Sequence, residues 1–125
     1  AWRAMLLAVS APFHCALMQP AADVMAGALS GVEMAAPSVP LVANVVASAV
    51  SDPGQIRSSL VAQVTGTVRW RESVAWMVAN GVTCFVEVGT GKVLTGMTRR
   101  MAPDASCMAT ASVADIEAVA QSLNT

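Results

Sequence analysis

Short apolar runs alternate along this 125-residue chain with longer segments of helical pattern, and prolines and glycines mark the boundaries between them. Continuous apolar or β-branched runs are typical of buried strands, whereas apolar residues repeated every three to four positions are typical of helices. Strands that alternate with helices favour a layered α/β fold in which the strands are parallel. A chain of this length forms one modest domain at most.

The pattern predicts short strands at both ends of the chain and in its middle. We expect strands over 5–9, 39–45, 83–88 and 106–109, a helical turn over 15–18, and helices over 20–29, 53–64, 70–80, 92–101 and 113–123. Pro20 and Pro53 suit the first positions of their helices, and Asp52 is a predicted N-cap. Gly31 and Gly81 are expected to end helices.

Charge and composition exclude several classes of protein. Seven basic and eight acidic residues give a net charge of -1 and are scattered, so the chain lacks the basic surface that nucleic acids require. The longest apolar stretch, 39–50, contains proline, asparagine and serine and is shorter than the roughly 20 residues of a membrane-spanning helix. No transmembrane helix is therefore predicted. Three cysteines without a close pair fit a reducing, cytoplasmic location.

A set of motifs in a fixed order carries the functional signal. The set comprises Ser-Ala-Pro-Phe-His-Cys-Ala-Leu-Met at 10–18 around the single histidine, His14, then Pro-Ala-Ala-Asp at 20–23, Val-Pro-Leu-Val-Ala-Asn-Val at 39–45, Gln63 seven residues before Trp70, and Glu-Val-Gly-Thr-Gly-Lys-Val-Leu-Thr-Gly at 87–96. In order and spacing this set resembles the C-terminal portion of the malonyl-CoA:acyl carrier protein transacylases, from their catalytic histidine onward.

The resemblance implies an acyltransferase of fatty acid biosynthesis that moves malonyl from malonyl-CoA, through an acyl-serine, to the phosphopantetheine thiol of acyl carrier protein. His14 would be the general base, because imidazole accepts and returns protons near neutral pH. The backbone carbonyl of Gln63 would orient the imidazole. Phe13 is a candidate for the acyl pocket, where its ring would leave no room for a branching methyl group, and packing of the loop explains this residue equally well. No metal and no cofactor are expected beyond the CoA thioester and the arm on the carrier protein.

The nucleophile of that family is missing from the sequence. Its serine lies in a G-x-S-x-G turn, and the nearest candidate, 27–31, has its first glycine one position out of place. We therefore expect residues 1–125 to be the C-terminal part of a single acyltransferase catalytic domain of α/β-hydrolase-like fold, with its N-terminal part absent, and to be inactive alone. An acyltransferase domain of a polyketide synthase and a non-catalytic fragment that only binds carrier protein remain alternatives.

Three further patterns have weaker functional interpretations. Gly89 to Lys92 lacks the spacing of a phosphate-binding loop, and Thr90, like Thr67, stands where the family usually has proline. His14 and the three cysteines lack the short ligand pair of a zinc site. A basic cluster contains the candidates Arg99 and Arg100 for docking the acidic carrier protein, together with Arg69, Arg71 and Lys92. Solvated helix arginines explain this cluster equally well.

Overall fold

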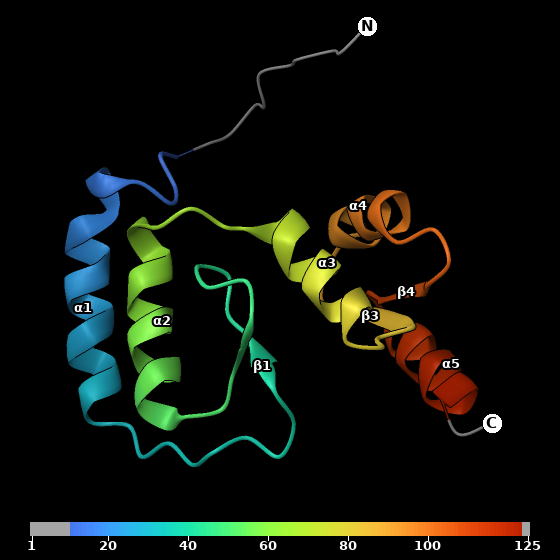
Figure 1. Cartoon of the computed structure of the whole chain (residues 1–125), viewed down its shortest axis with the longest axis horizontal. Coiled ribbons are helices and arrows are strands. Elements are labelled where there is room, and N and C mark those ends of the chain that lie inside the picture. Colours follow the sequence, from blue (N-terminus) through green and yellow to red (C-terminus); the bar gives the residue numbers. More distant parts are fainter. Residues whose placement is uncertain (1–10, 124–125) are drawn as a thin grey trace, which may run out of the picture. The chain divides into compact units, whose positions relative to one another are not determined.

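The computed structural model describes residues 11–123, and these residues form two compact units that meet in sequence between Arg69 and Trp70. In order, the elements are η1 (Ala16–Met18), α1 (Gln19–Ser30), β1 (Leu41–Val42), β2 (Ala49–Val50), α2 (Pro53–Thr65), α3 (Trp70–Ala79), β3 (Cys84–Val88), α4 (Val93–Met101), β4 (Ser106–Thr110) and α5 (Val113–Leu123) (Figure 1). The strand expected over 5–9 lies outside the described residues.

In the first unit, α1 and α2 pack side by side in opposite directions (Figure 1). Their boundaries follow the predicted signals. Pro20 lies in the first turn of α1 and Gly31 is its C-cap, while Asp52 caps α2 by accepting a hydrogen bond from the Gln55 N–H at 2.8 Å. The small core of this unit consists of Ala43, Val50 and Ile56, against which Met34 and Leu60 pack.

The prediction of a buried strand over 39–45 is wrong, because the observed strand is shorter and part of the segment is exposed. Only Leu41 and Val42 form β1, and Val39 is 69% exposed. The chain turns directly after β1, because the Ala47 N–H donates to the Ala43 carbonyl at 2.8 Å. This turn brings β2, which the sequence analysis did not predict, back against β1, and the pair is antiparallel rather than parallel.

In the second unit, β3 and β4 form a parallel pair, with Cys84 opposite Ser106 at one end of the ladder. Helix α4 connects the two strands, α4 and α5 pack against the pair, and α3 packs on α4. Helix α3 ends as predicted at Gly81, whose φ of +87° suits glycine, and the Val82 N–H returns to the Met77 carbonyl. The predicted elements of this unit are confirmed, with ends that shift by one residue.

The fold class is therefore confirmed as a mixed α/β arrangement with a short parallel strand pair flanked by helices. Within residues 11–123, no helix has both the length and the apolar character needed to cross a bilayer. The same stretch of chain holds no group of three or more metal-ligating side chains of the His, Cys, Asp or Glu types that could bind an ion.

Candidate active site

His14 lies in a tight loop directly before η1. The Phe13 N–H donates to the Ala11 carbonyl at 2.9 Å, and the Cys15 thiol donates to the Pro12 carbonyl at 3.1 Å. His14 itself has a φ of +57°, in the left-handed region that residues with a side chain rarely adopt. Such a conformation persists only where surrounding contacts determine it, and it is found often at functional sites.

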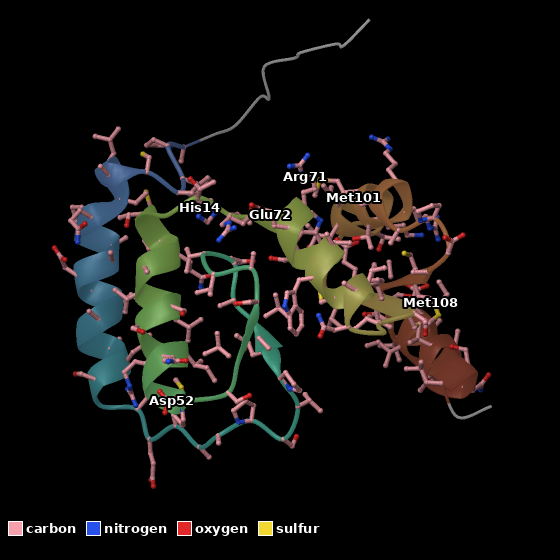
Figure 2. All side chains as sticks on the ribbon, viewed as in Figure 1. His14, Asp52, Arg71, Glu72, Met101 and Met108 are labelled. Carbon is pink, nitrogen blue, oxygen red and sulfur yellow. The ribbon has the colours of Figure 1, made fainter. Side chains whose placement is uncertain are left out.

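The imidazole of His14 contacts the backbone of α2. Its Nδ1 lies 2.8 Å from the carbonyl oxygen of Gln63, 49 residues further along the chain. Because a carbonyl oxygen can only accept a hydrogen bond, Nδ1 must carry the proton in this contact. The other ring nitrogen, Nε2, then has a free lone pair, and the side chain is exposed (Figure 2). The structure thus brings together His14 and the Gln63 carbonyl, the two groups that the sequence analysis paired.

The position of Gln63 explains why its carbonyl is available. The last four carbonyl groups of an α-helix have no partner within the helix, and Gln63 lies in the last turn of α2, which ends at Thr65. The Gly66 N–H occupies the carbonyl of Ala62 at 2.9 Å, so the next carbonyl, that of Gln63, is left for His14.

Asn44 is a residue of this site that the sequence analysis did not single out. The side-chain Nδ2 of Asn44 donates to Oε1 of Gln63 at 2.8 Å. The backbone carbonyl of Asn44 accepts from the Arg69 N–H at 2.9 Å. The Arg69 guanidinium donates in turn to the carbonyl of Val46 at 3.1 Å. The signal was present in the sequence, since Asn44 is a polar residue inside the apolar motif 39–45, but its partner 19 residues away could not be identified from the sequence.

The Val45 side chain of the Asn44 loop lies close to Gly66, the C-cap of α2. A Cβ atom on Gly66 would lie 2.8 Å from the carbonyl oxygen of Ala62 and 3.0 Å from Cγ1 of Val45. No other residue type fits there without movement of the backbone or of Val45. The glycine therefore lets residues 43–47 pack directly on the last turn of α2, beside Gln63.

The other predicted site residues, Phe13, Arg99 and Arg100, are also exposed. The Phe13 ring, next to His14, is 58% exposed among the described residues. Arg99 and Arg100 differ from each other, because the Arg99 guanidinium donates to the carbonyl of Cys107 at 2.9 Å and so ties α4 to β4. Arg100 is exposed and lines a surface groove of about 340 Å³, which we call the Arg100 groove, together with Trp70, Arg71, Met97 and Met101. Figure 2 shows Arg71 on α3 and Met101 on α4.

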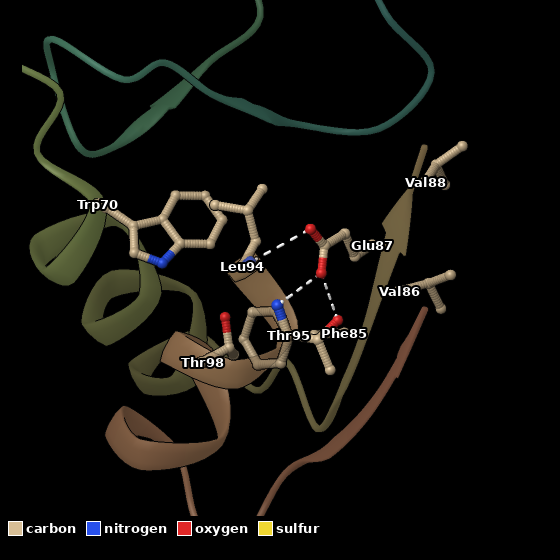
Figure 3. A pocket seen from close by; sticks show the side chains of 8 residues that line it. All are labelled: Trp70, Phe85, Val86, Glu87, Val88, Leu94, Thr95 and Thr98. Atoms are coloured by element: carbon tan, nitrogen blue, oxygen red, sulfur yellow. Dashed lines mark hydrogen bonds between the residues drawn. The ribbon is translucent and has the colours of Figure 1, made fainter. Parts of the chain in front are cut away.

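The motif at 87–96 builds a rigid turn rather than a phosphate site. The Glu87 carboxylate accepts from the N–H groups of Leu94 and Thr95 at 3.2 and 2.7 Å and from the Thr95 hydroxyl at 2.6 Å (Figure 3). These bonds, led by the one from the Thr95 hydroxyl, lower the pKa of Glu87 below its ordinary value. Because the carboxylate occupies the N–H groups of Leu94 and Thr95 in the first turn of α4, a phosphate would have to displace it and would meet its negative charge. The positive φ angles of Gly89 and Gly91 flank Thr90, so the turn needs glycine at those two positions.

Known proteins resemble the chain over almost its full length. The malonyl CoA-acyl carrier protein transacylase of Haemophilus influenzae is 42% identical over 121 residues, which are 97% of this chain and 39% of that protein. The crystal structure of acyl-carrier-protein S-malonyltransferase from Bartonella henselae is 53% identical with a TM-score of 0.87, and the match covers 98% of this chain and 39% of that one.

A third similar structure contains a partner. It is a malonyl-transacylase in complex with a type II polyketide synthase acyl-carrier protein, and it is 40% identical with a TM-score of 0.82 over 93% of this chain and 38% of that one. No model of a protein family matches the sequence. Identity above 40% over nearly the whole chain, together with the shared fold, leaves one conclusion: the chain is homologous to the malonyl-CoA:acyl carrier protein transacylases, and it spans about 39% of their length.

Proposed function

We propose that this chain supplies the general base of a malonyl-CoA:acyl carrier protein transacylase of fatty acid biosynthesis, and that His14 is that base. The hydrogen bond from Nδ1 of His14 to the Gln63 carbonyl carries the proposal. It fixes the tautomer that leaves Nε2 free to accept a proton, and it fixes the plane of the ring. In many acyl-transfer enzymes a carboxylate does this work, whereas here the acceptor is a backbone oxygen.

The reaction has two proton transfers in each half. Nε2 of His14 takes the proton from a serine hydroxyl as the serine oxygen attacks the thioester carbon of malonyl-CoA. The carbon–sulfur bond then breaks, and the proton passes from His14 to the departing thiolate of CoA. In the second half, His14 deprotonates the phosphopantetheine thiol of the carrier protein, which attacks the acyl-serine, and returns the proton to the serine oxygen. No metal or cofactor is needed for any of these steps.

The serine would come from the part of the protein that this chain does not span. The sequence contains no G-x-S-x-G turn, and the relatives extend over more than twice the matched length. We therefore propose that residues 1–125 are the C-terminal part of one acyltransferase domain and that they are inactive alone. The enzyme would work in the cytoplasm, where its substrate and its carrier protein are found.

Phe13 and the arginines of the second unit would contribute specificity. A ring directly before the base can exclude a methyl branch on the acyl carbon, and discrimination of this kind is worth about 1–3 kcal/mol. Acyl carrier proteins are strongly acidic, and the Arg100 groove offers two guanidinium groups around apolar side chains. Of the two docking candidates, Arg100 is better placed than Arg99, whose guanidinium donates to a backbone carbonyl.

One observation favours a second candidate function. The similar malonyl-transacylase in complex with a type II polyketide synthase acyl-carrier protein indicates that the same chemistry also serves polyketide synthesis in a related enzyme. The carrier protein would then differ, while the roles proposed for His14 and Gln63 would stay the same. Measurement of kcat/KM with carrier proteins of the two pathways distinguishes the candidates.

The proposed function is tested by an assay of malonyl transfer with the complete protein. We expect transfer of labelled malonyl from malonyl-CoA to holo carrier protein, and formation of a labelled acyl-enzyme when the carrier protein is omitted. Saturable binding of carrier protein by the complete protein, without either labelled product, would instead support a role limited to binding and would contradict our proposal.

A further inference from the structure

We propose that Asn44 is a positioning residue for His14 and that it acts through the side chain of Gln63. This inference rests on the function proposed above, because the orientation of His14 matters to turnover only if His14 is the base. Gln63 makes both contacts: its Oε1 accepts from Asn44 Nδ2 at 2.8 Å, and its backbone oxygen lies 2.8 Å from His14 Nδ1. A single residue therefore links Asn44 to the imidazole.

The Gln63 carbonyl belongs to the part of α2 that its own hydrogen bonds constrain least. Helix ends fray, because the last carbonyl groups have no partner within the helix. His14 is exposed and lies in a loop, so its ring would follow any displacement of the oxygen that holds it. An anchor on the Gln63 side chain, which is partly buried together with Asn44, limits that displacement.

The loop that carries Asn44 is well suited to serve as an anchor. The Asn44 backbone carbonyl accepts a hydrogen bond from the Arg69 N–H, and Cγ1 of Val45 in the same loop would lie only 3.0 Å from a Cβ atom on Gly66. Ala47, at the end of the same turn, has a φ of +56°, and His14 and Ala47 are the described non-glycine residues with positive φ. Both unfavourable conformations thus occur in the two segments that meet at the end of α2, where surrounding contacts must maintain them.

The expected effect falls on turnover rather than on substrate binding. A displacement of about 1 Å in a catalytic group can lower the rate of reaction about 100-fold. Loss of the hydrogen bond from Asn44 leaves His14 in place but constrains the orientation of its imidazole less. We therefore expect kcat to fall by a factor between about 10 and about 100. KM for malonyl-CoA should stay near the wild-type value.

The sharpest variant is Gln63→Ala in the complete protein. It keeps the backbone carbonyl that holds His14, and alanine is the best helix former, so α2 is not weakened. Only the anchored side chain is lost. Asn44→Ala removes the other half of the same hydrogen bond, so the double variant should be no slower than either single variant. Losses that multiply in the double variant would overturn the proposal.

Asn80→Ala is the matched control. Asn80 also donates from its side chain to a carbonyl near a helix end, that of Trp76 at 2.8 Å, but this contact lies at the end of α3. Its kcat should equal that of the wild type. If Gln63→Ala and Asn44→Ala also keep wild-type kcat, Asn44 does not position the base.

A second readout is independent of turnover. Nitrogen-15 NMR of the imidazole, assigned by comparison with His14→Ala, should report the Nδ1–H tautomer in the wild type and a mixture of tautomers in Gln63→Ala and Asn44→Ala. An unchanged tautomer in both variants would overturn the inference. If His14→Ala retains normal turnover, it is the proposed function that fails, and the tautomer measurement still decides whether Asn44 positions the ring.

Discussion

At the scale of single residues, the site depends on one hydrogen bond between a loop and a helix end. His14 adopts a rare backbone conformation with its Nδ1 2.8 Å from a carbonyl of α2. The sequence pointed to both residues, because the resemblance placed His14 and Gln63 in matching motifs. Asn44 stood out in the sequence only as a polar residue in an apolar motif. Its partner could not be identified, since the bond from Asn44 to Gln63 depends on how a loop folds against α2, and a local pattern contains no such information.

Phe13 gives a prediction about selectivity. We expect Phe13→Ser to raise kcat/KM for methylmalonyl-CoA relative to malonyl-CoA by about 10-fold, because the smaller side chain leaves room for one methyl group. Leu17→Ser is a suitable control, since Leu17 is a nearby apolar residue that is 75% exposed. An unchanged ratio in Phe13→Ser would mean that Phe13 does not line the acyl site.

At the scale of elements, two glycines in helical surroundings should respond in opposite ways to alanine. Gly66→Ala should lower the free energy of unfolding by about 1–3 kcal/mol, because the new methyl group would overlap the Ala62 carbonyl and Val45. Gly27→Ala, inside α1 with nothing within 4 Å of the added Cβ, should raise stability by about 0.5–1 kcal/mol. Thermal unfolding of both variants tests this contrast, and a stabilised Gly66→Ala would disprove the close approach.

The Glu87 carboxylate, which accepts hydrogen bonds from the first turn of α4, predicts a dependence of stability on pH. Hydrogen bonds from the Thr95 hydroxyl, Thr95 N–H and Leu94 N–H lower the pKa of Glu87 from the ordinary value of 4.5. A carboxyl group whose pKa is lower in the folded state stabilises that state above the ordinary pKa, and this contribution is lost as the pH falls through the folded pKa. Glu87→Gln should therefore flatten the fall in melting temperature between about pH 6 and about pH 3.

The control for that experiment is Glu33→Gln, which changes an exposed glutamate in a loop of the first unit. Its melting temperature should depend on pH as that of the wild type does. An equally steep fall in Glu87→Gln and the wild type would show that the carboxylate at the start of α4 adds no acid-sensitive stability.

The elements also show which sequence signals suffice. The predicted helices are confirmed because local signals fix their ends, such as Asp52 as N-cap and Gly81 in the left-handed conformation. The strand over 39–45 was wrong because an apolar run alone does not reveal the turn at 43–47, where the backbone bond from Ala47 to Ala43 ends the strand. That turn carries Asn44, so the same failure of prediction hid the third residue of the site.

At the scale of the whole molecule, the Arg100 groove gives a prediction about the partner. We expect Arg100→Glu in the complete protein to raise KM for the acidic carrier protein roughly tenfold at low salt, with kcat at saturation unchanged. A charge at the edge of an interface mainly changes the rate at which the two proteins associate. Lys92→Glu is the matched control, since Lys92 is exposed but does not line the groove. Equal effects of the two variants would indicate a general response to charge rather than docking at this surface.

The most direct test of the account is kcat of His14→Ala in the complete protein, measured with malonyl-CoA and holo carrier protein at saturation. Because base and nucleophile act as a unit, we expect kcat to fall by a factor on the order of 10³ or more, with the fold retained. Turnover close to that of the wild type would contradict the central claim that His14 is the general base.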